Sequence, residues 1–306
     1  MASYELVMGI LLLFQTIVGN VLFLSFYILT SFSKHTWRPT DLITNQLASA
    51  NFLVLFSRGI PQALAAFYLD YSLGEPMCKI TFYIQRVAQG VSLCTTCLLS
   101  GFQAITISPN NSGWAELKPK APRAPRFVQP SCCLCWNLHL LINIIVPVKV
   151  THSRTTINIT KMQFGLCATE KSDSSISSLY AFLFTFLDIL CLGPMGWASG
   201  FIVLFLQRHR QRIKYRHHAY LSLRASSETT ATHTVLLPVS SFVSFYFLSS
   251  ILSLCRTCFV TQSLQLANIS AFLAVCFPAF SPYLFISHDI QTLRIYFVSF
   301  KTKISK

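Results

Sequence analysis

The chain alternates between long, mostly apolar runs and short segments that hold most of its charged residues. Seven of these runs have about 20 residues or more, which is the length that a helix needs to cross a hydrocarbon layer of roughly 30 Å. Each run must be helical, because unpaired backbone groups are costly in lipid and a helix pairs its own. The pattern predicts an all-α, seven-transmembrane helix bundle that forms a single domain over residues 1–306. The predicted spans lie near residues 6–29, 42–69, 80–107, 127–150, 179–206, 234–254 and 264–287, and a short tail covers 288–306.

Composition favours a membrane protein over a soluble one. Hydrophobic residues make up 53% of the chain, charged residues only 11%, and the mean hydropathy is +0.53, whereas soluble domains are typically about 25% charged. The first apolar run lacks a basic segment before it and is too long for a cleaved signal, so we interpret it as a retained span.

The positions of Lys and Arg predict the orientation of the chain. They concentrate in alternate loops and in the tail, and "RHRQRIKYRHH" directly continues the fifth predicted span. By the positive-inside rule these segments face the cytoplasm, so the N-terminus is outside and the C-terminus is cytoplasmic. Because the bases lie beside spans, we assign the net charge of +14 to membrane lipid and an acidic cytoplasmic partner, and not to nucleic acid.

Two cysteines are predicted to face the oxidising outer compartment. Cys78 lies at the outer end of the third span and Cys167 in the following outer loop, so a disulfide between them is expected. Cys255 and Cys258, near the outer end of the sixth span, are alternative partners. Most of the other cysteines lie inside spans, where a thiol behaves as a small apolar group.

Three Asn-x-Ser/Thr sequons are present, at Asn110, Asn158 and Asn268. The predicted topology places Asn110 in the cytoplasm and Asn268 in or beside a span. Asn158, in the outer loop, is therefore the predicted glycosylation site.

Three charged side chains stand out inside the predicted spans: Arg58, Arg86 and Asp188. A charge in a membrane is costly unless it finds a partner or water, so each is a candidate functional residue. Arg86 and Asp188 lie at similar depths, roughly 10 to 14 Å from the outer ends of the third and fifth spans. These two residues are predicted to pair, either as a structural salt bridge or as the lining of a ligand site.

Other intramembrane residues complete the candidate set. Arg58 precedes Gly59 and Pro61, which loosen the helix and free a carbonyl. We interpret Arg58 as a structural residue that points into the bundle, with a place in the cavity lining as the alternative. Tyr83 and Gln89 are additional ligand-binding candidates. Pro282 is a structural intramembrane residue of the seventh span, either a flex point or a static kink.

Secondary features also carry expectations. His139, in the fourth span, is expected to hydrogen-bond to another helix. Three glycines of the fifth span, in "GPMGWASG", are expected to allow close helix packing.

Several strings in the chain resemble one receptor family. "SRGIPQ" (57–62), "TCLLSGFQAITISP" (96–109), "WAELK" (114–118), "SFVSFY" (241–246) and "CFPAFSPYLF" (276–285) together are similar to the vomeronasal type-1 receptors, a branch of the G-protein-coupled receptors. Asn51 stands where the wider rhodopsin-like class has an aspartate, and "FQAITISP" replaces that class's inner carboxylate and arginine. The resemblance implies a chemosensory receptor in the plasma membrane that binds a small, pheromone-like or volatile ligand and activates an inhibitory-class heterotrimeric G protein.

Other classes of function lack their motifs. The sequence contains no zinc-protease motif, no Gly-x-Ser-x-Gly elbow and no pair of aspartates inside the predicted spans. We therefore expect that the protein is not an enzyme and has no catalytic residue, bound metal or cofactor. A transporter would usually show repeated halves, and none is evident. A transporter and a receptor relic that no longer signals remain the alternatives.

Overall fold

The computed structural model of this chain is almost entirely helical in the part that it describes. The helices are η1 (Thr16–Val21), α3 (Pro39–Phe67), α4 (Glu75–Ile107), α5 (Ala124–Ile142), η3 (Asn143–Ile145), α6 (Val146–Lys149) and α7 (Ser174–Arg216). The described residues are 16–21, 39–67, 75–108, 124–152, 162–164, 167–169, 174–216 and 275–283, with single residues or pairs at 7, 10–11, 14, 25, 244–245, 247–248, 251 and 273.

Three of the described helices are long and apolar enough to cross a membrane. These stretches are Pro76–Ile107 in α4, Phe127–Val148 in α5 to α6, and Phe182–Phe205 in α7. The predicted span at 42–69 coincides largely with α3, a 29-residue helix. The first, sixth and seventh predicted spans fall mostly outside the described residues.

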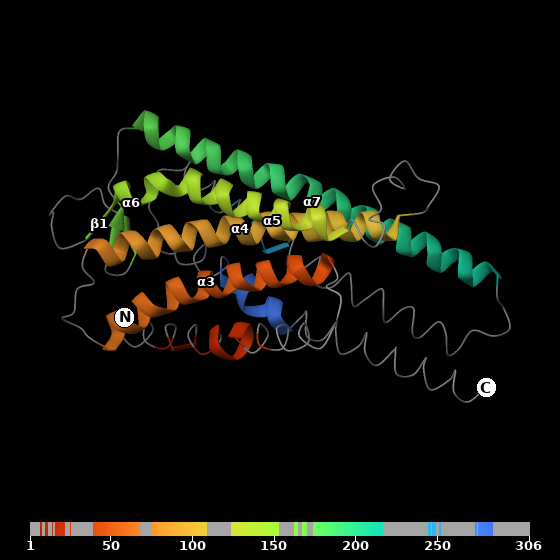
Figure 1. The fold of residues 1–306 in the computed structure, drawn as a ribbon, viewed down its shortest axis with the longest axis horizontal. Helices are drawn as coiled ribbons and strands as arrows, with labels where there is room; N and C mark the ends of the chain where they lie inside the picture. Colours follow the sequence, from red (N-terminus) through yellow and green to blue (C-terminus); the bar gives the residue numbers. More distant parts are fainter. Residues whose placement is uncertain are drawn as a thin grey trace.

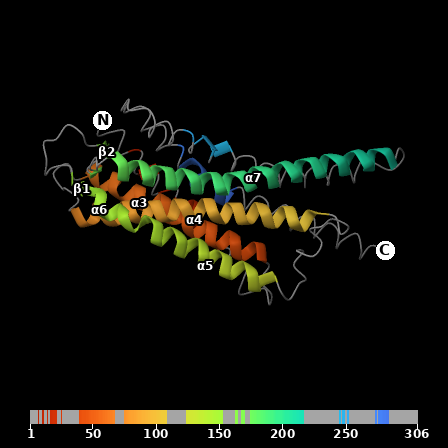
Figure 2. The same ribbon diagram turned by 90° about the horizontal axis from the view of Figure 1, so that it is seen from above.

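Helix α4 occupies the centre of the described bundle. It contacts α3, α5 and α7, and Figures 1 and 2 show these helices running alongside it. Of the three candidate spans, the α4 span has the largest buried share. A side chain on α4 can therefore face any of three neighbouring helices, which makes this helix the natural place for a site inside the bundle.

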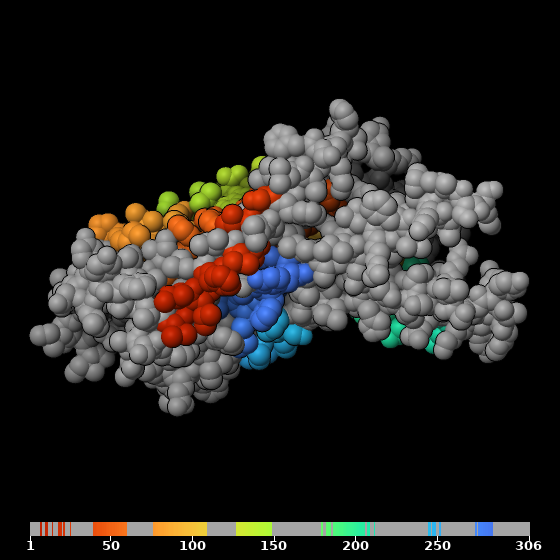
Figure 3. Space-filling view, turned by 90° about the horizontal axis from the view of Figure 1, so that it is seen from below, coloured from red at the N-terminus to blue at the C-terminus, as the bar shows by residue number. Residues whose placement is uncertain are grey.

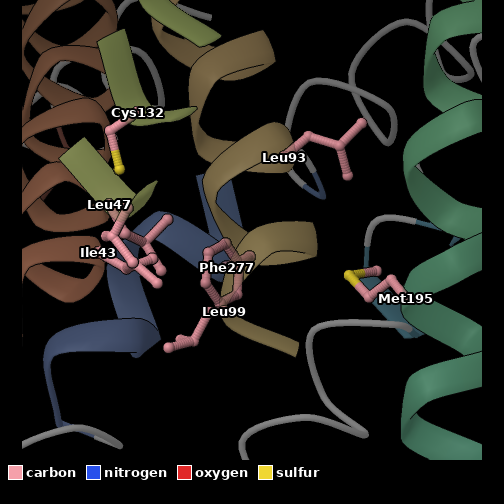
Figure 4. Packing of buried hydrophobic residues seen from close by; sticks show 8 residues of the cluster. Ile43, Leu47, Leu93, Leu99, Cys132, Met195 and Phe277 are labelled. Carbon is pink, nitrogen blue, oxygen red and sulfur yellow. The ribbon is translucent and has the colours of Figure 1, made fainter. Parts of the chain in front are cut away.

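The apolar core joins the helices around α4. Figure 4 shows Phe277 beside Leu99 of α4 and facing Ile43 and Leu47 of α3, while Met195 extends from α7. Large apolar side chains on the other faces of α5 and α7 are exposed. Apolar outer faces on a helical bundle are what a lipid environment stabilises, since lipid meets apolar side chains without cost.

The described pieces from the two ends of the chain lie near one another. Figures 1 and 3 show the N-terminal pieces beside residues 275–283. The π-helix η1 contacts α3, and its Gly19 is buried. The described pieces of the first and last apolar runs therefore lie next to one another beside α3.

The described helices extend past the predicted spans, α4 and α7 most of all, because a hydrophobic run marks only the lipid-embedded part of a helix. Helix α4 begins at Glu75, five residues before the predicted span. Helix α7 covers 43 residues and continues to Arg216. The basic segment that follows the predicted fifth span is therefore helical as far as Arg216.

The C-terminal end of the fourth predicted span is irregular for a local reason. Pro147 has no N–H, so it cannot donate to the carbonyl of Asn143 four residues earlier. Instead, Val146 N–H donates to Asn143 O, which gives the tighter turn η3 between α5 and α6.

A small sheet corrects the prediction of a purely helical protein. It consists of β1 (Val150–His152), β2 (Met162–Phe164) and β3 (Cys167–Thr169). The order is β1-β3-β2, both pairings are antiparallel, and His152 lies opposite Cys167. Strands of three residues are too short to show a period of two in the sequence, so the pattern did not reveal them. Strand β1 contacts α4.

Candidate functional site

The central feature of the candidate site is Arg86, on the α7-facing side of α4. Its guanidinium carbon lies 5.5 Å from the centroid of the Phe184 ring on α7, within the range of a cation–π interaction. Phe184 and Asp188 are four residues apart and share one face of α7. The charge of Asp188 acts on Arg86, so the structure brings the two predicted charges to facing helices, with an aromatic ring one turn away.

Arg86 is more exposed than the two residues that follow it on α4. Its side chain is exposed, while the next two residues, Val87 and Ala88, are buried. Phe184 and Asp188 are half-buried. The structure therefore brings a cation, an aromatic ring and a carboxylate together between α4 and α7.

The two additional candidates on α4 point to different sides. Successive helix residues turn by about 100°, so Tyr83 and Gln89 lie about 60° from Arg86 in opposite directions. Tyr83 faces α5, where its hydroxyl donates to Leu140 O at 3.0 Å. Gln89 is half-buried and lies on the face between Arg86 and Ser92. Of the two, Gln89 is the better placed to share a surface with Arg86.

The remaining predicted residues are only partly described. Arg58 is half-buried in α3, and Pro282 is buried. Cys78 is fully buried and disulfide-bonded. Cys167 belongs to strand β3, of which only the backbone is described. Asn158 lies outside the described residues, as do Asn110 and Asn268.

A buried polar hub connects α3, α4 and residues 275–283. Asn51 Oδ1 accepts a hydrogen bond from Ser92 Oγ at 2.5 Å, and Asn51 Nδ2 donates to Ser281 Oγ at 2.8 Å. All three side chains are at most 1% exposed. The sequence singled out Asn51 and Ser281 as departures from a wider receptor pattern, but the contact partners are 41 and 230 residues away from Asn51 and leave no local signal.

Helix α5 is fixed to α3 by a second polar contact. Trp136 Nε1–H donates to Gln46 Oε1 at 3.0 Å. Trp136 also packs against a cluster formed by Ala50, Val87 and Val91. This contact holds α3, α4 and α5 together on the side of α4 away from Arg86.

The close helix contact in this region is made by Gly90 and not by the predicted glycines. A Cβ at Gly90 would overlap the imidazole of His139 on α5. Among the described residues, nothing lies within 4 Å of the Cβ positions of Gly193, Gly196 and Gly200, so the expected close packing at these three glycines is wrong for this part of the chain. The face of α7 that carries Gly193 and Gly200 is exposed, and a small residue brings helices together only where a neighbour is present.

His139 was expected to hydrogen-bond to another helix, and its Nδ1 atom does not form such a bond within the described part of the chain. Its Nδ1 is buried and has no hydrogen-bond partner among the described residues. Its backbone carbonyl accepts from Asn143 Nδ2 at 2.8 Å within the same segment. His139 therefore contributes packing against Gly90, and its side chain does not join the helices by a bond at Nδ1.

Three cysteines follow Arg86 and Asp188 along α4 and α7, on the sides of these helices that face each other. The side chains of Cys94 and Cys97 interact with Cys191 of α7, and all three thiols are free. Within the described ranges, no group of three or more His, Cys, Asp or Glu residues is arranged to hold a metal ion.

Comparison with known proteins gives a consistent family match. Residues 6–298 match the model of the vomeronasal organ pheromone receptor family. The chain is 42% identical over 301 residues to vomeronasal type-1 receptor 4 of Pongo pygmaeus, covering 97% of this chain and 99% of that protein. It is 43% identical over 301 residues to vomeronasal type-1 receptor 1 of Homo sapiens, covering 97% and 84%. It is also similar to olfactory receptor class A-like protein 1 of Danio rerio, at 28% over 274 residues, covering 89% and 85%.

Proposed function

The chain belongs to the vomeronasal type-1 receptor family, and from this premise we propose that it binds a small organic ligand inside its helix bundle and activates an inhibitory-class G protein. Family membership makes the chain a membrane protein of the chemosensory, G-protein-coupled type. It also makes the transporter alternative unnecessary, because no described feature favours transport.

The observation that supports a ligand site is the juxtaposition of Arg86 on α4 with Phe184 and Asp188 on α7. A cation and a carboxylate inside a membrane satisfy each other when no ligand is bound. A ligand with an apolar body and one polar group gains contact with the ring and competes for one of the two charges. Such a ligand has different affinities for the paired and the separated arrangement, so it shifts the population between them.

The buried hub gives this shift a route across the bundle. Asn51 of α3 hydrogen-bonds both to α4 and to residues 275–283. A displacement of α4 relative to α7 therefore also acts on the contact with residues 275–283. Pro278 and Pro282 lie in that segment, where each proline removes one backbone hydrogen bond and permits bending. Helix movement there would open the cytoplasmic side of the bundle to a G protein.

The proposal also includes the topology and the covalent features that the sequence predicts. The N-terminus is outside and the C-terminus is cytoplasmic, with a glycan on Asn158. Seven cysteines are free and Cys78 is bonded, so of the 11 cysteines only Cys167, Cys255 and Cys258 can be its partner. Cys167 is the best candidate because β3 pairs with β1, and β1 contacts α4.

A direct test is G-protein dissociation in intact cells that display the receptor at the surface. Cells expressing the chain are exposed to a panel of volatile organic compounds, and dissociation of inhibitory, stimulatory and calcium-coupled G proteins is recorded in parallel. We expect at least one compound to release only the inhibitory-class protein, with the signal removed by pertussis toxin. A response through another class would overturn the coupling, and transport of labelled compounds without any G-protein response would overturn the receptor assignment.

A further inference from the structure

The cytoplasmic end of α7 carries arginines in a regular arrangement on one helix face. Arg208, Arg212 and Arg216 recur every four residues, and each step turns the position by only about 40°. We call these three residues the arginine stripe. Arg210 and Lys214 lie on the opposite side of the helix, about 200° from Arg208 and Arg212. No Asp or Glu occurs between Asp188 and Glu228, so no acid in this stretch neutralises either face.

The helix carries the stripe beyond the packed bundle. The cytoplasmic end of α4 at Ile107 packs in the cluster formed by Ala198 and Ile202 of α7, and the candidate span of α7 ends at Phe205. Figure 2 shows the following part of α7 projecting past the ends of α4 and α5. Arg208 is exposed there. Nothing in the described structure covers this part of the helix.

Distances along α7 determine which anion fits the stripe. At 1.5 Å per residue, Arg208 lies about 4.5 Å past Phe205, Arg212 about 10.5 Å and Arg216 about 16.5 Å. Headgroups extend the bilayer by only about 5 to 7.5 Å on each side of the hydrocarbon. Snorkelling to phospholipid phosphates explains Arg208. The other two stand beyond that layer, and the screening length is only about 8 Å at physiological ionic strength.

We infer that the arginine stripe of α7 is a binding site for the polyphosphorylated inositol headgroup of an inner-leaflet lipid. Such a headgroup protrudes from the membrane and carries several phosphates, so it reaches Arg208 and Arg212 together. Guanidinium groups bind phosphate oxygens through two parallel hydrogen bonds, which makes an all-arginine face more selective than a mixed one. This site goes beyond the proposed function, because it requires neither the chemosensory ligand nor the G protein.

The test measures lipid binding by the full-length receptor in nanodiscs. Discs contain phosphatidylcholine alone, or phosphatidylcholine with phosphatidylserine or phosphatidylinositol 4,5-bisphosphate at equal total charge, and bound lipids are counted by native mass spectrometry. One variant, R208Q/R212Q, removes two charges from the stripe. Its matched control, R210Q/K214Q, removes two charges from the opposite face. Thermal melting of both variants checks folding, and the residues changed lie outside the packed bundle.

The expected result is a preference for the bisphosphate lipid that depends on the stripe. Each arginine near the surface is worth a factor of about five in binding, so R208Q/R212Q should bind about 25-fold more weakly. R210Q/K214Q should lose less than about fivefold, because its charges act only through the screened field. R208K/R212K, which keeps the charge, should fall between these values.

Four outcomes would overturn the inference. Equal losses in the two glutamine variants would show a non-specific field, and equal binding of phosphatidylserine would show no headgroup selectivity. If micromolar inositol 1,4,5-trisphosphate displaces the lipid and the membrane contributes nothing to its binding, the site belongs to a soluble ligand. If R208Q/R212Q instead binds lipid normally and fails only in G-protein activation, the stripe serves the protein partner.

Discussion

Replacing Asn51 by leucine should destabilise the bundle, because this residue holds two helices to α3. The change keeps the approximate volume and removes both interhelical bonds, to Ser92 Oγ at 2.5 Å and to Ser281 Oγ at 2.8 Å. Interhelical hydrogen bonds in membranes average about 0.6 kcal/mol and reach about 1.7 kcal/mol, so losing both costs about 1 to 3 kcal/mol. At about 2 °C per kcal/mol for a chain of this size, the melting midpoint should fall by roughly 2 to 6 °C.

The assay is thermal melting of detergent-solubilised receptor, followed by size-exclusion chromatography of the remaining monodisperse protein. Asn137→Leu is the matched control, because Asn137 is exposed on α5 and its Nδ2 bonds only to Cys133 O of the same helix. This control should melt at or above the wild-type temperature, since it places an apolar side chain on the outer face. Ser281→Ala combined with Asn51→Leu should cost less than the sum of the single changes.

An Asn51→Leu midpoint equal to that of wild type would refute the reasoning. Strict additivity of Asn51→Leu and Ser281→Ala would also count against it, because residues that share a bond are energetically coupled. Either outcome would mean that the hub contributes no net stability and that apolar packing around Phe277 alone holds residues 275–283 in place.

Three further changes test other parts of the account. Gly90→Ala should lower the melting midpoint by an amount that corresponds to about 1 to 3 kcal/mol, because its Cβ would overlap the His139 imidazole. Gly101→Ala on the same helix is the control: its Cβ meets nothing within 4 Å among the described residues, so it should be neutral or slightly stabilising. Equal losses of stability in the two variants would disprove the contact. Asn158→Gln should remove the glycan-dependent gel shift, and a shift that persists would contradict the outer loop assignment. Cys78→Ser should lower surface abundance, and peptide mapping of the wild-type protein should recover Cys78 linked to Cys167, not to a cysteine of the sixth span.

Much of the fold follows from the apolar runs, because lipid admits only helices of sufficient length. Helix ends are less well defined, since α7 continues through a basic segment that hydropathy alone excludes from the span. The turn at η3 is explained by Pro147 only once the neighbouring carbonyl contacts are known. The sheet formed by β1, β2 and β3 depends on pairing between short segments, for which the sequence has no local pattern.

Candidate site residues could be predicted from the sequence where placing the side chain in a membrane has an evident free-energy cost. Arg86 and Asp188 stood out because a charge in a span requires an explanation. Phe184 did not, because aromatic residues are common in spans and its role depends on the position of Arg86. Gly90 was likewise indistinguishable from other glycines, since the contact with His139 exists only in three dimensions.

The most direct test of the central claim is the effect of exchanging the charges of Arg86 and Asp188 on G-protein activation. Concentration–response curves are recorded for the most potent compound of the volatile panel, with surface abundance matched by labelling. Arg86→Asp should abolish the response, and the double variant Arg86→Asp/Asp188→Arg should recover part of it. A full response of Arg86→Ala at wild-type surface abundance would contradict the placement of the ligand between α4 and α7.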